Sequence, residues 1–90
     1  MLQEMVKEMM NEMDVVFSLA KEKAITSLEK PNHTKEPWND FHNGFLVGRL
    51  FEEIREFENT NDIKSENEEI LDIINTAVFL YLSNEKEMVV

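Results

Sequence analysis

Residues 70–82 read Ile-Leu-Asp-Ile-Ile-Asn-Thr-Ala-Val-Phe-Leu-Tyr-Leu. They belong to the most apolar of the helices that we predict from the sequence of this 90-residue chain. Projected on a helix, their apolar side chains cover most directions, which is typical of a helix buried on most sides. Asp72 lies inside the stretch, with Glu69 one turn before it and Thr76 one turn after it. An ionised carboxylate in apolar surroundings is costly unless a cation compensates it, so the stretch predicts a cation beside Asp72.

Two more amphipathic helices precede this one in the sequence. Residues 2–30 place apolar side chains at steps of three and four, without Gly or Pro, which predicts one long helix. The segment from Pro31 to Pro37 is typical of a loop, because proline breaks the helical hydrogen-bond ladder. The second helix is expected to begin between Trp38 and Asp40 and to end near residue 58.

The third helix is expected after a short polar turn at residues 59–64. Ser65 and Glu68 form a capping-box pattern with Ser65 as the N-cap, and the helix is expected to end at residue 83 or 84. Residues 85–90 are expected to be a frayed tail. Two Gly and two Pro residues leave little turn chemistry for a sheet of short strands, so we expect one all-α domain over residues 1–84.

The composition excludes several functional classes. The chain has no Cys, which excludes disulfides, thiolate nucleophiles and zinc–thiolate sites. Its 19 acidic and 9 basic side chains give a net charge of −10, which disfavours nucleic acid as a partner. The longest strongly apolar run, residues 77–82, is too short to cross a bilayer, and no signal-peptide pattern is visible. We therefore expect a cytoplasmic protein without membrane contact.

The small size of the chain predicts self-association. A domain of 90 residues buries roughly 60–65% of its unfolded surface, which leaves a thin core. Three helices do not easily surround the apolar third helix, so we expect a homodimer or homotetramer that completes a four-helix-type bundle. Gly44 and Gly48 lie four residues apart in the second helix, where each costs up to about 1 kcal/mol relative to Ala. They predict tight packing against another helix or close approach of a ligand.

Four carboxylates are expected to converge between the second and third helices. An antiparallel pair brings Glu53 and Glu56, near the end of one helix, opposite Glu69 and Asp72, near the start of the next. Such groups repel each other unless a divalent cation neutralises them, and all-oxygen ligands select Mg²⁺, Mn²⁺ or Ca²⁺. A solvated helix face is the alternative for the glutamates of the second helix, and it is weak for Asp72.

Four further residues are candidates for binding a substrate. Arg49 shares the carboxylate face and suits a phosphate group, with an ion pair to one of its two following glutamates as the alternative. Trp38 can stack on a base or anchor the helix start in the core. His42 can hydrogen-bond a phosphate or base, or lie exposed on the helix. Asn75 can contact a ligand or metal, or form a hydrogen bond between two helices.

The spacing of the carboxylates resembles a known motif. Glu52, Glu53 and Glu56, followed after twelve residues by Glu69 and Asp72, resemble the EExxE…ExxD pattern of the MazG-like and dimeric dUTPase superfamily. The surrounding helix pattern extends the resemblance to about residues 38–83.

Two details near the motif bear on this resemblance. Residues 37–40, Pro-Trp-Asn-Asp, look like the Pro-Trp-Asp start of the second helix in MazG proteins. Leu71 replaces the Gly that the family has before its final Asp, a change that should not disturb metal ligands.

The resemblance implies an all-α, Mg²⁺-dependent nucleoside triphosphate pyrophosphohydrolase, for which Mn²⁺ is an alternative ion. Such enzymes cleave between the α and β phosphates with a metal-activated water and release a nucleoside monophosphate and pyrophosphate. Carried over by position, Glu53, Glu56, Glu69 and Asp72 would be the metal ligands. Glu52 would hold another ion or orient the water, so that Glu52 and Glu53 are the candidate catalytic residues.

The alternative is a non-catalytic helical module. The first 30 residues contain five of the six methionines, which suits a protein whose first helix binds in the groove of a partner. A nucleotide-binding protein without hydrolytic activity is a further possibility. Asp72 distinguishes the interaction module from the enzyme, because an interaction module gains nothing from a carboxylate inside its most apolar helix.

Overall fold

The computed structural model describes residues 1–28 and 43–89, and all regular secondary structure in these ranges is helical. Helix α1 spans Leu2–Leu28, α2 spans Asn43–Glu58 and α3 spans Ile63–Val89. The expected all-α fold with a long first helix is therefore confirmed. The loop and the helix start expected at residues 31–40 lie outside the described residues.

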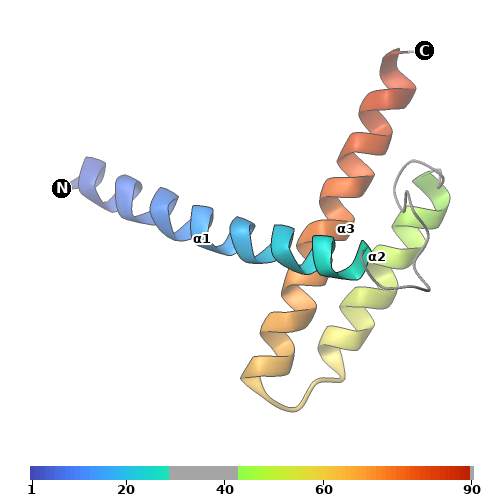
Figure 1. Cartoon of the computed structure of the whole chain (residues 1–90), viewed down its shortest axis with the longest axis horizontal. Coiled ribbons are helices and arrows are strands. Elements are labelled where there is room, and N and C mark those ends of the chain that lie inside the picture. The colour runs from blue at the N-terminus through green and yellow to red at the C-terminus, as the bar shows by residue number, and fades with distance from the viewer. Residues whose placement is uncertain (29–42, 90) are drawn as a thin grey trace.

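Helices α2 and α3 form an antiparallel hairpin, as the short polar turn predicts (Figure 1). Helix α2 ends where the Thr60 hydroxyl donates a hydrogen bond of 2.7 Å to the carbonyl of Phe57. This hydrogen bond satisfies one of the carbonyl groups left free at a helix C-terminus. The hairpin brings the second half of α2 alongside the first half of α3, the two segments that carry the acidic motif.

The N-cap of α3 is Asp62, and the prediction of Ser65 as the cap is wrong. The Oδ1 atom of Asp62 accepts a hydrogen bond of 2.8 Å from the Ser65 amide, and its Oδ2 atom accepts one of 3.0 Å from the Ser65 hydroxyl. Ser65 therefore acts as a donor to the cap, one turn inside the helix. At its other end α3 continues to Val89, beyond the end expected at residue 83 or 84.

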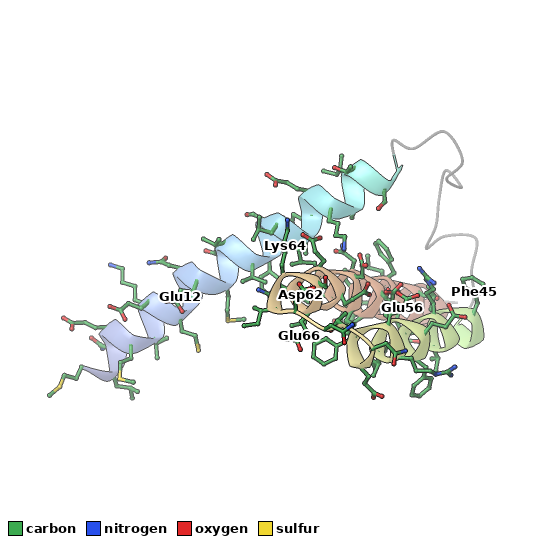
Figure 2. The ribbon with its side chains drawn as sticks, turned by 90° about the horizontal axis from the view of Figure 1, so that it is seen from below. Glu12, Phe45, Glu56, Asp62, Lys64 and Glu66 are labelled. Carbon is green, nitrogen blue, oxygen red and sulfur yellow. The ribbon has the colours of Figure 1, made fainter. Side chains whose placement is uncertain are left out.

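Helix α1 crosses α3 and, among the described residues, makes no comparable contact with α2 (Figure 1). Its contact is centred on Ala20, which is 2% exposed, and the Asn75 side-chain amide donates a hydrogen bond of 2.9 Å to the Ala20 carbonyl. The N-terminal half of α1 extends beyond the hairpin, with Glu12 on the extended part (Figure 2).

The apolar core of a single chain is very small. Within residues 1–28 and 43–89, the buried apolar side chains are those of Ala20 and Leu46. Several apolar residues of α3 are exposed, up to Ile63 at 74%, so α3 is not buried on most sides by its own chain. A Cβ atom added to Gly48 would meet nothing within 4 Å, so the tight packing expected there does not occur within one chain. No helix in the described ranges is long and apolar enough to span a membrane.

The Asp62 cap should determine how firmly the first turn of α3 is closed. We expect Asp62→Ala to speed amide hydrogen exchange at Ser65 and Glu66 several-fold, because the Ser65 amide loses its acceptor. Asp62→Asn should retain most of the protection, and Asn61→Ala, at the exposed neighbouring position, should leave it unchanged. Equal exchange in Asp62→Ala and the unmodified protein would show that Asp62 is not the cap.

Candidate metal centre

Three carboxylates from two helices meet inside the hairpin. Glu53 comes from α2, and Glu69 and Asp72 come from α3, where a spacing of three residues puts them on one helix face. One carboxylate oxygen of each residue lies within 4.8 Å of those of the other two. The expected approach of Glu53 to Glu69 and Asp72 across the antiparallel pair is therefore observed.

Glu53 is the most deeply placed of the three. Its residue is 3% exposed, and its Oε2 atom is buried without a hydrogen-bond partner in the described part of the chain. The Oε2 atom of Glu69 is likewise buried and unpartnered. Buried polar atoms almost always have a partner, because an unpartnered one costs on the order of 1–3 kcal/mol. Two such oxygens in one cluster call for a physical explanation.

The environment of Glu53 favours its protonated form. Burial raises its pKa to about 7; the Arg49 charge acts in the opposite direction, and the nearby Asp72 and Glu56 charges raise the pKa further. Burial also raises the pKa of Glu69; a side-chain hydrogen bond with Glu53 acts to lower it, and the charges of Glu56 and Asp72 raise it further. Without a cation in the cluster, Glu53 therefore tends to hold a proton near neutral pH.

Arg49 lies on the α2 side of the cluster. Its Nη2 atom is 2.7 Å from Oε1 of Glu53, and its Nη1 atom is 2.9 Å from Oε2 of Glu52. Partial burial acts to lower the pKa of Arg49, but the hydrogen bond to Glu52 and the charges of Glu53 and Glu52 raise it. The ion-pair alternative stated for Arg49 is thus present, and the pair satisfies one of the two oxygens of Glu53.

Lys23 of α1 lies on the other side of the cluster and was not among the predicted site residues. Its Nζ atom is 3.0 Å from Oδ1 of Asp72 and 3.2 Å from Oε2 of Glu68. Burial acts to lower the pKa of Lys23, but Asp72 and Glu68 raise it. The sequence contains one signal for this contact: Lys23 lies between Ala20 and Ala24 on the apolar face of α1.

The remaining predicted residues fall into three groups. Glu52 and Glu56 are exposed on α2 and are not part of the three-carboxylate group, although the charge of Glu56 acts on Glu53 and Glu69. Asn75 forms the hydrogen bond between helices that was its alternative role. Trp38 and His42 lie outside the described residues.

Comparison with known proteins identifies an archaeal relative. The chain is 34% identical over 62 residues to an uncharacterized protein of Archaeoglobus fulgidus, a match that covers 66% of this chain and 67% of the archaeal protein. No protein-family model matches the chain. No solved structure matches it either.

The raised pKa of Glu53 predicts how the stability of the metal-free protein depends on pH. Because the folded-state pKa of about 7 lies above the ordinary value of 4.5, the folded state binds more protons than the unfolded state between these values. This contribution to the free energy of unfolding is complete below about pH 4.5 and is lost as the pH rises through 7. We expect a loss on the order of 3 kcal/mol.

Urea unfolding in EDTA at pH 5 and pH 8 checks this pH dependence. Glu53→Gln should flatten it, since the amide does not ionise, whereas Glu58→Gln, at an exposed position of the same helix, should retain it. If the free energy of unfolding depended on pH equally in Glu53→Gln and in the unmodified protein, Glu53 would not be the cause of that dependence.

Proposed function

This chain belongs to the family of the uncharacterized Archaeoglobus fulgidus protein, and we propose from its carboxylate cluster that it is a divalent-metal-dependent nucleoside triphosphate pyrophosphohydrolase. The reaction is nucleoside triphosphate plus water to nucleoside monophosphate plus pyrophosphate. The observation that carries the proposal is the pair of buried, unpartnered oxygens on Glu53 and Glu69 beside Asp72.

The residues of the cluster fit a hard divalent cation. Carboxylate oxygens are the ligands that Mg²⁺ and Mn²⁺ prefer, and the three residues come from two helices whose positions the hairpin fixes. An ion would supply a partner for both orphaned oxygens and would offset the burial and the neighbouring negative charges that raise the pKa of Glu53. Glu56 is the nearest candidate for a fourth ligand, because its charge already acts on both Glu53 and Glu69.

The roles of the chain's own residues follow from their positions. Glu53, Glu69 and Asp72 would bind the ion, which would lower the pKa of a coordinated water and neutralise phosphate charge. Glu52, exposed and next to Glu53 in the chain, would orient that water and accept its proton. The oxygen of the water bonds to the α phosphorus while the bond from that phosphorus to the bridging oxygen breaks. The leaving group is pyrophosphate, and no nucleophilic side chain is required.

Arg49 is suited to hold the phosphates. It is about half exposed and ion-paired to Glu52 and Glu53, so its guanidinium already lies at the edge of the cluster. Planar guanidinium groups bind phosphate oxygens in pairs, and a nucleotide supplies such oxygens in place of Glu52. Trp38 and His42 remain candidates for the base or the phosphates, and Asn75 remains a candidate for ligand contact.

The exposed surface supports the expected homodimer or homotetramer. The chain exposes 7400 Å², whereas a folded monomer of this mass exposes about 5500 Å². The excess of roughly 1900 Å² exceeds the ~800 Å² per partner that a stable interface buries. On α2, Gly44, Val47, Gly48 and Phe51 form an exposed small and apolar stripe at helical spacing. A helix of another copy could pack closely against this stripe, whereas no group of the same chain packs against Gly48.

The free half of α1 favours a second candidate function, that of a non-catalytic interaction module. Four methionines of α1 are exposed, at positions 5, 9, 10 and 13. A shallow apolar groove of about 280 Å³ lies among Met9, Met13, Val16 and Phe17 with Glu12 at its edge. Methionine-rich surfaces adapt to apolar partners. The buried carboxylates have no role in such a module, which is why we favour the enzyme.

Pyrophosphate release from a panel of NTPs and dNTPs tests the proposed activity. We expect release with Mg²⁺ or Mn²⁺ and none with EDTA, and a loss on the order of 100-fold in both Glu53→Gln and Asp72→Asn. Glu58→Gln should retain wild-type activity. Absence of release from every nucleotide, together with no stabilisation by Mg²⁺ in a melting assay, would refute the enzyme and favour the interaction module.

Light scattering coupled to gel filtration tests the assembly. We expect a mass of two or four chains, and we expect Gly48→Leu to shift the protein towards the monomer because the added side chain blocks close approach at the stripe. Asn67→Leu, which adds the same side chain at an exposed position of α3, should leave the mass unchanged. A stable wild-type monomer would contradict the proposed assembly.

A further inference from the structure

Lys23 connects α1 to the carboxylate cluster through more contacts than a simple surface ion pair. Its Nζ atom lies 3.0 Å from Oδ1 of Asp72 and 3.2 Å from Oε2 of Glu68, and it donates a hydrogen bond of 2.8 Å to the main-chain carbonyl of Glu68. An ammonium group has three N–H donors, so these three acceptors use all of them. The side chain is 27% exposed. The ammonium group is therefore held in one place relative to α3.

The contact with Asp72 leaves one carboxylate oxygen for another ligand. Lys23 engages Oδ1, while a carboxylate offers two oxygens. Hydrogen bonds from neighbouring groups orient metal-binding carboxylates in this way, and loss of such a partner weakens metal binding 10- to 100-fold. The backbone carbonyl of Asp72 is also fixed, because it accepts a hydrogen bond of 2.9 Å from the Thr76 hydroxyl.

We propose that Lys23 is a positioning residue of the metal centre: it holds Oδ1 of Asp72 so that the carboxylate is oriented towards Glu53 and Glu69, and it makes the docking of α1 part of the metal site. This inference rests on the proposed metal centre. It adds a residue from α1, 29 residues before the acidic motif, to a site otherwise built from α2 and α3.

The local charge does not oppose this role. Glu53, Glu69 and Asp72 carry three negative charges when an ion is bound, and Glu68 adds a fourth beside Lys23. One ammonium group leaves this region negative, so a divalent cation is still attracted to it. A purely structural ion pair could use Glu68 alone, and the additional contact with Asp72 is what connects Lys23 to the candidate ligands.

The proposal has a thermodynamic consequence for α1. If docked α1 strengthens metal binding, then bound metal must strengthen the docking of α1 by the same factor. The docked segment is anchored by Lys23 and by the hydrogen bond from Asn75 to the Ala20 carbonyl, so its amides report on docking. Metal should therefore slow hydrogen exchange around residues 20–26.

Titration with Mn²⁺ alone, followed by calorimetry, tests the proposal in the full chain without any nucleotide. We expect Lys23→Met to weaken Mn²⁺ binding about tenfold and Lys23→Arg to restore most of the affinity, because arginine can also donate to Asp72. Lys21→Met, an exposed position on the same helix, should bind as the wild type does. Wild-type or tighter affinity in Lys23→Met would overturn the proposal, and tighter binding would identify Lys23 as a competitor of the ion.

Hydrogen exchange in the wild-type protein tests the same proposal without depending on the folding of a variant. We expect Mn²⁺ to slow exchange at residues 20–26 up to tenfold, over the concentration range in which the ion binds. Unchanged or faster exchange would overturn the proposal. A wild-type protein that binds no Mn²⁺ would overturn both this inference and the proposed function. Binding without nucleotide hydrolysis would overturn the proposed activity alone, and the comparison of variants would then still decide the role of Lys23.

Discussion

The central physical constraint in this structure is the mutual repulsion of three carboxylates, those of Glu53, Glu69 and Asp72. No other group in the described part of the chain fully compensates their charge. Glu53 is almost completely buried, faces Glu69 and Asp72, and has only one of its two oxygens paired, with Arg49. Burying a charge is costly unless it is compensated, and the raised pKa of Glu53 is the consequence of that cost. A fold with so small a core gains no stability from this arrangement. The cost is understandable if the cluster binds a cation, since functional sites commonly trade stability for chemistry.

The two cationic side chains beside the cluster, Arg49 and Lys23, differ in exposure and in the partners they bind. Arg49, from α2, is about half exposed and pairs with Glu53 and Glu52, so it can exchange a carboxylate for a phosphate group. Lys23, from α1, is more buried and uses all its donors on α3. Under the proposed function, Arg49 would therefore be available to a substrate, whereas Lys23 is fixed to α3. A long helix that makes few other contacts with the hairpin is in this way connected to the site.

Much of the fold and the centre of the site follow from the sequence, because helical periodicity and a short polar turn are local signals. They place Glu53 opposite Glu69 and Asp72 without any knowledge of tertiary contacts. The cap of α3 was mispredicted because Asp62 and Ser65 are both good capping residues three positions apart, and the carboxylate accepts the hydrogen bonds that Ser65 donates. Lys23 was not predicted because its role depends on where α1 crosses α3, which periodicity does not specify. Burial of α3 on most sides was predicted, but several of its apolar residues stay exposed in the described part of this single chain.

A crystal structure of the protein soaked with Mn²⁺, with anomalous scattering recorded at the manganese edge, tests the central claim most directly. The carboxylate cluster around the buried Glu53 predicts one strong anomalous peak per chain, within ligand distance of Glu53, Glu69 and Asp72 and absent from crystals of Glu53→Gln. A peak bound only by exposed acidic residues elsewhere, or no peak at a manganese concentration that saturates ordinary carboxylate sites, would contradict the claim. The buried charge of Glu53 would then require a different explanation.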